Sequence, residues 1–152
     1  MKSFALVTGA SSGIGLQICH SLASRGYNVI LTSRSEDKLK SISEQIRSKY
    51  KVESNFFPTD LADNNGPQNI FNFCRSNNYH IDILINNAGY ALPESFEKNS
   101  VEDEEKCIRV LGTSVISLTK LFVREMIKKK QGKIMIVSSV AAFAPPAAIQ
   151  VM

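Results

Sequence analysis

Short segments rich in apolar residues alternate with segments of helical periodicity, and this alternation constrains the fold more than any other feature. The short segments are expected strands and occupy residues 4–7, 29–31, 52–57, 81–85 and 134–137. Three of them are wholly apolar, whereas Asp82 interrupts 81–85 and the apolar residues of 52–57 are Val52, Phe56 and Phe57. Continuous apolar strands are typical of sheets that are covered on both faces. Strands that alternate with helices form parallel β-α-β units, and right-handed crossovers arrange them in a doubly wound layer. The sequence therefore predicts a Rossmann-like α/β sheet of about five strands.

The segments between these runs carry helix signals. Ile14, Ile18 and Leu22 recur at helical spacing, and Gly26 stands where that helix should end. Ser35 can cap the next helix, and Gly66-Pro67 opens another. A long helix is expected from about Ser100 to Lys130, and its expected inner face consists of Ile108, Leu111, Val115, Phe122 and Met126.

The composition fits one globular domain over residues 1–152. Hydrophobic residues make up 43% and charged residues 21%, which argues against disorder. The net charge of +4 is not concentrated in a run, so we expect no nucleic-acid partner. Cys19, Cys74 and Cys107 are odd in number and far apart, as reduced thiols of a cytoplasmic protein would be. Two isolated histidines supply no paired ligands, so no metal is expected.

One uncharged segment, residues 134–152, is long enough to be tested as a membrane span. Ser138-Ser139 and Pro145-Pro146 interrupt it, and proline breaks helices. A buried strand followed by a loop is the better interpretation, and we expect no membrane partner.

A glycine-rich turn, Thr8–Gly15, lies between the first expected strand and the first expected helix. Its glycines are spaced differently from G-x-G-x-x-G, but the physical requirements are the same. Gly9 permits a tight turn, Gly13 lets a pyrophosphate approach the backbone, and Gly15 lets the helix pack closely on the sheet. The free N–H groups of the helix N-terminus can then bind phosphate oxygens. The turn predicts a dinucleotide site.

The end of the second expected strand bears on the choice of nucleotide. An NAD site usually has an acid there that binds the ribose hydroxyls, whereas this strand ends in Thr32-Ser33-Arg34. Arg34 can pair with a 2′-phosphate through two parallel hydrogen bonds, and Ser33 can donate another. We therefore expect NADP(H) to be preferred over NAD(H).

Four motifs together resemble the short-chain dehydrogenase/reductase family. They are Thr8–Gly15, Asp60-Leu61, Asn86-Asn87-Ala88-Gly89 and Ile136-Val137-Ser138-Ser139, in the order and at the intervals of that family. The resemblance implies that Asp60 and Leu61 contact the adenine of the cofactor. It also implies that Asn87, Ala88 and Gly89 line the nucleotide crevice while Asn86 braces the sheet. The remaining expected cofactor-binding residues belong to the first motif: Gly9, Ser11, Ser12, Gly13, Ile14 and Gly15.

The same resemblance implies hydride transfer between a nicotinamide and a carbonyl or alcohol, but the catalytic set is incomplete. Ser139 matches the family's catalytic serine, whereas Arg109 stands where the family has an asparagine that supports a proton relay. The family's tyrosine would fall at Met152, and no Tyr-x-x-x-Lys segment is present. A positioned proton donor contributes about 10²–10⁴-fold in rate. We therefore expect an oxidoreductase fragment with weak or no activity alone.

The resemblance also implies that strands and helices of the family are missing after the fifth strand. That strand is then expected to be an unpaired edge that could bind a second copy or a partner chain. Two alternatives stay open: a non-catalytic module that binds a nucleotide or a partner, and the N-terminal part of a full-length reductase.

Overall fold

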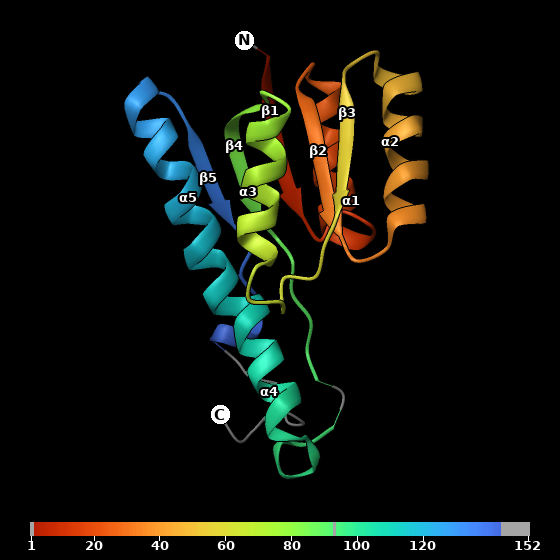
Figure 1. Ribbon diagram of the computed structural model, residues 1–152. Helices are drawn as coiled ribbons and strands as arrows, with labels where there is room; N and C mark the ends of the chain where they lie inside the picture. Colours follow the sequence, from red (N-terminus) through yellow and green to blue (C-terminus); the bar gives the residue numbers. More distant parts are fainter. Residues whose placement is uncertain (1, 93, 144–152) are drawn as a thin grey trace.

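Five parallel strands form one sheet with helices on both faces, as the alternation of the sequence predicts (Figure 1). The computed structural model describes residues 2–92 and 94–143. The expected tyrosine position, Met152, and the Pro145-Pro146 segment lie outside the described residues. The strands are β1 (Ser3–Thr8), β2 (Asn28–Ser33), β3 (Ser54–Pro58), β4 (His80–Asn86) and β5 (Lys133–Ile136).

Helices occupy the connections between the strands. The longer ones are α1 (Gly13–Ser24), α2 (Glu36–Tyr50), α3 (Gly66–Ser76), α4 (Val101–Ile108) and α5 (Ser114–Lys129). A π-helical segment, η2 (Arg109–Thr113), joins α4 to α5. Two single 3-10 turns, η1 (Phe96–Lys98) and η3 (Val140–Ala142), lie in the loops after β4 and β5.

The strand order is β3-β2-β1-β4-β5, so the chain reverses its direction across the sheet between β3 and β4. Consequently β1 and β4 are neighbours whose following connections leave in opposite directions. Val7 lies opposite Ile85, which places the carboxyl ends of both strands at the same edge of the sheet. In open α/β sheets this point of reversal is where ligands bind.

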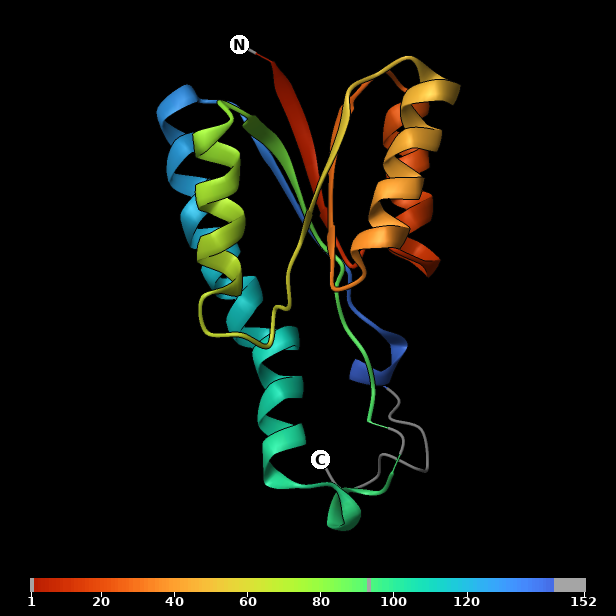
Figure 2. The same cartoon turned by 45° about the vertical axis from the view of Figure 1, so that its right-hand side comes forward.

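The two faces of the sheet carry separate hydrophobic cores. Figure 2 shows α1 and α2 on one face, and α3 and α5 on the other. The core on the side of α1 and α2 includes Val7, Cys19, Leu31, Leu39 and Ile46. The core on the side of α3 and α5 includes Phe4, Leu6, Ile70, Leu118 and Phe122.

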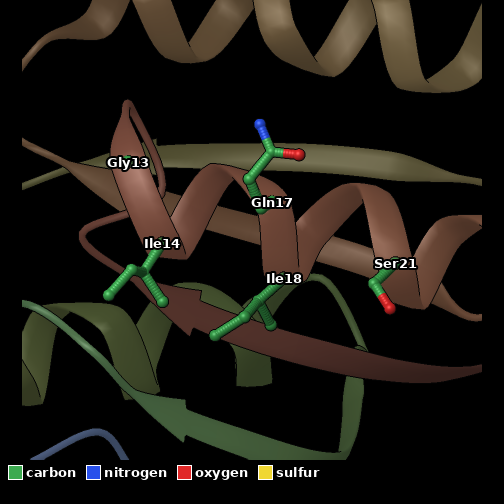
Figure 3. Close-up of a pocket in the computed structure, with 5 residues that line it drawn as sticks. All are labelled: Gly13, Ile14, Gln17, Ile18 and Ser21. Atoms are coloured by element: carbon green, nitrogen blue, oxygen red, sulfur yellow. The ribbon is translucent and has the colours of Figure 1, made fainter.

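Small residues form the face of α1 that contacts the sheet. Gly15, Cys19 and Ala23 are buried, whereas Ile14 is 63% exposed. Ile14 and Ile18 lie together beside a shallow pocket on the outer side of the helix (Figure 3). The close approach of α1 to the strands therefore depends on small side chains, and the larger apolar residues flank this contact.

The long helix runs through α4, η2 and α5 as expected, but its expected inner face is wrong at the N-terminal end. Ile108 and Leu111 are 64% and 51% exposed. The π-helical segment inserts an extra residue and rotates the preceding turns relative to α5. In addition, α4 extends beyond the carboxyl edge of the sheet (Figure 1). The buried residues of the long helix recur every four positions and include the expected Phe122 and Met126: Val110, Ser114, Leu118, Phe122 and Met126.

Within the described chain β5 is an edge strand, because it pairs with β4 alone. Met135 is 48% exposed and Ile136 is 57% exposed. Among the residues that the structure describes, β5 therefore presents one side without a neighbouring strand.

Candidate functional site

The glycine-rich turn connects β1 to α1 and adopts a backbone that requires glycine at two positions. Gly9 has φ +65° and Gly13 has φ +54°, and side-chain-bearing residues rarely adopt these values. A Cβ atom on Gly13 would meet nothing within 4 Å. Gly13 therefore leaves open space at the N-terminus of α1.

The first turn of α1 keeps its N–H groups available for a ligand. Ser12 is the residue before the helix, and its side chain makes no capping hydrogen bond. Helix N-terminal N–H groups that lack such a partner bind anions, and the helix dipole favours negative charge there. An uncapped N-terminus beside the open space at Gly13 fits a pyrophosphate group.

The turn packs tightly against the segment that follows β4. A Cβ atom on Gly9 would lie 2.9 Å from Ala88 Cα and 3.0 Å from Asn87 Nδ2. A Cβ atom on Gly15 would lie 2.4 Å from Gly9 O. Asn87 Nδ2 donates to Thr8 O at 2.9 Å. The structure thus brings together the first and third sequence motifs at the point of reversal in the sheet.

Thr8 is a residue of this site to which sequence reasoning gave no separate role. Its buried hydroxyl oxygen accepts hydrogen bonds from the backbone N–H groups of Asn87 at 2.9 Å and Ala88 at 3.0 Å. The same hydroxyl donates to Ile85 O at 3.3 Å. The sequence does contain an indication of this role, because Thr8 is a hydroxyl-bearing residue between the apolar run at residues 4–7 and Gly9. Thr8 holds the segment after β4 against the glycine-rich turn.

The tips of β2 and β3 form the second part of the site. Arg34 and Asp60 line one pocket of about 440 Å³, beside Ala62. Ser33 Oγ is buried without a hydrogen-bond partner in the structure. Asp60 accepts a hydrogen bond from the N–H of Ala62 at 2.9 Å, which shapes the loop after β3. The pocket has the size of ordinary small-molecule sites, and its place at the end of β2 fits the ribose of a dinucleotide.

Asp60 and Leu61 have different surroundings. Leu61 is 8% exposed and belongs to the core on the side of α3 and α5. Gly66 lies so close that its Cβ would stand 2.3 Å from Asp60 O. Leu61 therefore anchors this loop from within the core, and Asp60 is the residue that faces the pocket.

Ser139 lies just past the end of β5 and is exposed. Its Oγ accepts a hydrogen bond from the N–H of Ala141 at 3.1 Å and caps the turn η3. Asn86 is buried, and its Nδ2 donates to Thr119 Oγ1 at 3.3 Å. Asn86 thus ties β4 to α5, which agrees with its expected bracing role.

Tyr90, the tyrosine that directly follows the Asn86–Gly89 segment, does not have the lowered pKa that proton transfer near neutrality requires. Tyr90 follows Gly89 and is 41% exposed. Desolvation raises the pKa of Tyr90, and the nearby Cys107 and Asp60 raise it further. A tyrosine that gives or takes a proton near neutrality needs a lowered pKa. Glu94 rather than a lysine stands four residues after Tyr90, so neither its pKa nor its spacing suits that role.

Arg109 and Leu111 point to different parts of the molecule. Arg109 Nη1 donates to Asn64 Oδ1 at 2.9 Å, in the loop after β3. Leu111 instead approaches the crevice, because a Cβ atom on Gly89 would lie 2.8 Å from Leu111 Cδ2. In space, the long-helix residue beside the Asn86–Gly89 segment is therefore Leu111, although the family resemblance placed Arg109 at the position of the relay asparagine.

No group of metal-ligating side chains and no potential membrane span occurs within the described residues. No cluster of three or more His, Cys, Asp or Glu residues is found there. None of the described helices combines the length and hydrophobicity that crossing a bilayer requires. Burial raises the pKa of the Cys19 and Cys74 thiols to about 12, so they are unreactive near neutral pH.

Known proteins with similar sequences are reductases. A relative from Aquifex aeolicus, a 3-oxoacyl-(acyl-carrier-protein) reductase, is 36% identical over 142 residues, which are 91% of this chain and 56% of the relative. A human very-long-chain 3-oxoacyl-CoA reductase is 34% identical over 151 residues, which are 95% of this chain and 47% of the relative. The chain spans about half the length of these curated relatives.

Solved structures give the same result. An L-sorbose reductase from Gluconobacter frateurii, complexed with NADPH and L-sorbose, superposes with a TM-score of 0.91 at 28% identity and matches 98% of this chain and 56% of its own. A short-chain dehydrogenase from Sphingobium yanoikuyae in complex with NADPH has a TM-score of 0.89 at 28% identity and matches 98% and 58%.

The family model for short chain dehydrogenases matches residues 3–151, nearly the whole sequence. That match agrees with the parallel five-stranded sheet and with the nicotinamide cofactors in the similar structures. This chain belongs to the short-chain dehydrogenase family.

Proposed function

We propose that this chain is the nucleotide-binding half of a short-chain dehydrogenase-type oxidoreductase and that it binds NADP(H) in preference to NAD(H). The observation that carries the proposal is the end of β2, where Arg34 lines the pocket and no acid occupies the strand tip. Within the described chain Arg34 makes no ion pair, so its guanidinium is available to a ligand. A 2′-phosphate is a ligand group that a guanidinium binds with two hydrogen bonds.

Each part of the site would have a distinct task. The N–H groups at the start of α1 bind the pyrophosphate, and Thr8 holds the Asn87-Ala88 segment that borders it. Arg34 binds the 2′-phosphate. The bound nicotinamide cofactor supplies the hydride. Ser139 offers a hydrogen bond to a substrate oxygen beyond the end of β5.

Hydride transfer by these 152 residues alone is proposed to be weak or absent. Ser139 can orient a substrate oxygen, but a proton must also reach it, and the raised pKa of Tyr90 makes that phenol a poor donor. Arg109 stays protonated at working pH and is equally unsuited to general-acid chemistry. Turnover of aldehydes and ketones with NADPH should therefore stay near background. Substantial turnover that is lost in Ser139→Ala would contradict this part of the proposal.

The preference for NADPH is tested by calorimetric titration of the 152-residue chain with NADPH and NADH. NADPH should bind at least about tenfold more tightly, since hydrogen bonds to charged groups contribute about 1.5–3 kcal/mol. Arg34→Ala should remove most of the difference by weakening NADPH binding alone. Lys38→Ala removes an equal charge from an exposed position of α2 and is the matched control. Equal affinities in the unaltered chain would refute the preference.

A second function, binding of a partner chain or a second copy, is favoured by β5. Its free edge and the half-exposed Met135 and Ile136 side chains could pair with another strand. Ile136→Lys should then abolish any association that sedimentation velocity detects in the unaltered chain. A chain that stays monomeric at high concentration and retains no partner would contradict this second function. The three free thiols support a cytoplasmic location as part of the proposal.

A further inference from the structure

Four helices end at the edge of the sheet where the strands begin, which lies opposite the glycine-rich turn. Each of α1, α2, α3 and α5 ends four residues before the next strand starts. Figures 1 and 2 show the ends of α2 and α5 at the same end of the molecule as the start of β1, and α4 at the far end. We call this surface the amino edge, and it consists of residues 2–4, 22–29, 47–55, 73–82 and 125–134.

The amino edge is strongly basic. It holds ten lysine and arginine residues against three acidic residues, a net charge of +7. The whole chain has a net charge of +4, so the remaining residues carry −3. Four consecutive acidic residues, 102–105 in α4, belong to the opposite end. No single run in the sequence shows this separation of charge, because the strand order brings distant segments together.

The helix dipole accounts for only part of this positive charge. A helix C-terminus carries about half a negative charge, so four of them carry about −2. The net charge on the side chains is roughly three times as large. Lys2 and Lys133 also lie outside the helices, at the starts of β1 and β5. The amino edge therefore has a positive charge that the helix ends do not require.

Most of these cations are free to meet a ligand. All ten are exposed. Among the residues that the structure describes, Lys2 pairs with Glu53 and Lys128 lies 3.3 Å from Glu125, and the other eight form no ion pair. Exposed ion pairs contribute little to stability, so an anionic partner can compete for these two lysines as well.

The cations are spread across the width of the sheet. The border strands β3 and β5 are four inter-strand spacings apart, which is about 19 Å. That distance is more than twice the screening length of about 8 Å at physiological salt. A short acidic segment therefore engages only one border, whereas an extended anionic surface engages both at once.

The composition of the amino edge favours lipid over nucleic acid. Seven of the ten basic residues are lysines, which act as point charges, whereas the planar fork of arginine suits bidentate phosphate recognition. Two large side chains with apolar bodies are also exposed there, Ile127 at 69% and Tyr27 at 42%. Lysines beside exposed apolar and aromatic side chains are typical of protein surfaces that attach to anionic bilayers.

We propose that the amino edge is a docking surface for an anionic lipid bilayer, which the lysines bind at both borders of the sheet and into which Ile127 and Tyr27 insert. The acidic α4 is repelled by the same bilayer, so the chain attaches in one orientation and its glycine-rich turn faces away from the lipid. Although we expected no membrane partner from residues 134–152, attachment at a surface needs no spanning segment. The proposal is independent of cofactor binding.

The test is co-flotation of the 152-residue chain with phosphatidylcholine vesicles that contain about one third phosphatidylserine. The chain should float with these vesicles and not with pure phosphatidylcholine, and salt at about 0.5 M should release it. The paired variants Arg47→Gln/Lys49→Gln and Lys129→Gln/Lys133→Gln neutralise one border each. Each pair should lower the partition coefficient about fivefold per charge removed, and circular dichroism checks that the variants fold.

Lys38→Gln/Lys40→Gln is the matched control, because it removes two exposed charges from the opposite end of α2. It should change the partition coefficient by less than about twofold. Ile127→Ser should weaken vesicle binding about fivefold and leave any binding of duplex DNA unchanged. Absence of flotation at low salt, an equal loss in the control, or a loss confined to one border would overturn the proposal. Tighter binding of duplex DNA than of the anionic vesicles would overturn it in favour of a nucleic-acid partner.

Discussion

At the scale of single residues, one hydroxyl group connects the two strand ends that form the site. Thr8 is 1% exposed and satisfies the N–H groups of both Asn87 and Ala88. Buried donors that lose their partner cost about 1–3 kcal/mol each. The position of the Asn86–Gly89 segment therefore depends on a residue at the end of β1, 78 positions before the first of these residues in the sequence.

The Thr8 hydroxyl gives a direct prediction for stability and binding. Thr8→Val keeps the shape but leaves two N–H groups without an acceptor, so the free energy of unfolding should fall by about 2–4 kcal/mol. NADPH affinity should fall as well, because the segment loses its support. Thr8→Ser keeps the hydroxyl and should lose less than half as much stability. Denaturant unfolding followed by circular dichroism measures both, and equal losses in the two variants would contradict the role of the hydroxyl.

Residue types that a backbone or a charge requires could be predicted from the sequence. Gly9 and Gly13 do adopt positive φ values, and Arg34 does line a pocket at the tip of β2. The bonds of Thr8 and the direction of Arg109 could not be predicted. Both depend on which loops become neighbours when the chain reverses across the sheet, and local spacing does not contain that information.

At the scale of elements, the long helix shows how a local irregularity changes which face is buried. Leu118 is fully buried, whereas Ile116, two positions earlier, is 60% exposed. The π-helical segment η2 separates the register of α4 from that of α5. Apolar periodicity predicted the existence of the helix and the burial of Phe122 and Met126. It failed at Ile108 and Leu111, because a π turn leaves no clear signal in the pattern.

Truncation of two neighbouring residues of α5 tests this orientation. Leu118→Ala should lower the free energy of unfolding by about 2–5 kcal/mol, the range for large-to-small changes in cores. Ile116→Ala should change it by less than about 0.5 kcal/mol, as exposed sites usually do. Urea unfolding curves give both values. A larger loss for Ile116→Ala than for Leu118→Ala would mean that the opposite face of α5 contacts the sheet.

The other elements follow closely from local chemistry. Each short segment that the sequence predicted as a strand does form one, and Gly26, with φ +83°, lies two residues after the end of α1. The strand at 52–57 begins two residues later than expected, at Ser54, because the ladder with β2 starts at the pair Val29 and Ser54. Strand ends are set by the partner strand, so a single segment does not specify them.

At the scale of the whole molecule, two buried thiols should make the free energy of unfolding decrease as the pH rises above neutrality. Burial raises the pKa of Cys19 and of Cys74 to about 12 in the folded chain, against about 8.5 for an exposed thiol. A raised pKa in the folded state contributes stability below pH of about 8.5, and this contribution is lost as the pH rises toward 12. The lost contribution corresponds to about 1.4 kcal/mol per pH unit for each thiol.

Removal of one thiol should flatten this dependence. Between pH 9 and pH 11 the free energy of unfolding of Cys19→Ala should fall less steeply with pH than that of the unaltered chain. The two slopes should differ by about 1.4 kcal/mol per pH unit, which corresponds to the release of one proton. Cys107→Ala is the control, since Cys107 is only half-buried. Urea unfolding at a series of pH values provides the slopes. Parallel curves for Cys19→Ala and the unaltered chain would contradict the burial of this thiol in the core between α1 and the sheet.

We propose that the glycine-rich turn, the tip of β2 and the segment after β4 form one NADPH site. It is tested most directly by following backbone amide resonances of the 15N-labelled chain during titration with NADPH. The largest shifts should cluster at the three segments that the structure brings together: residues 9–15, 33–34 and 87–89. Residues 60–66 should shift less with NADH than with NADPH. Shifts confined to β5 or to the outer side of α1, or none at saturating NADPH, would contradict the account.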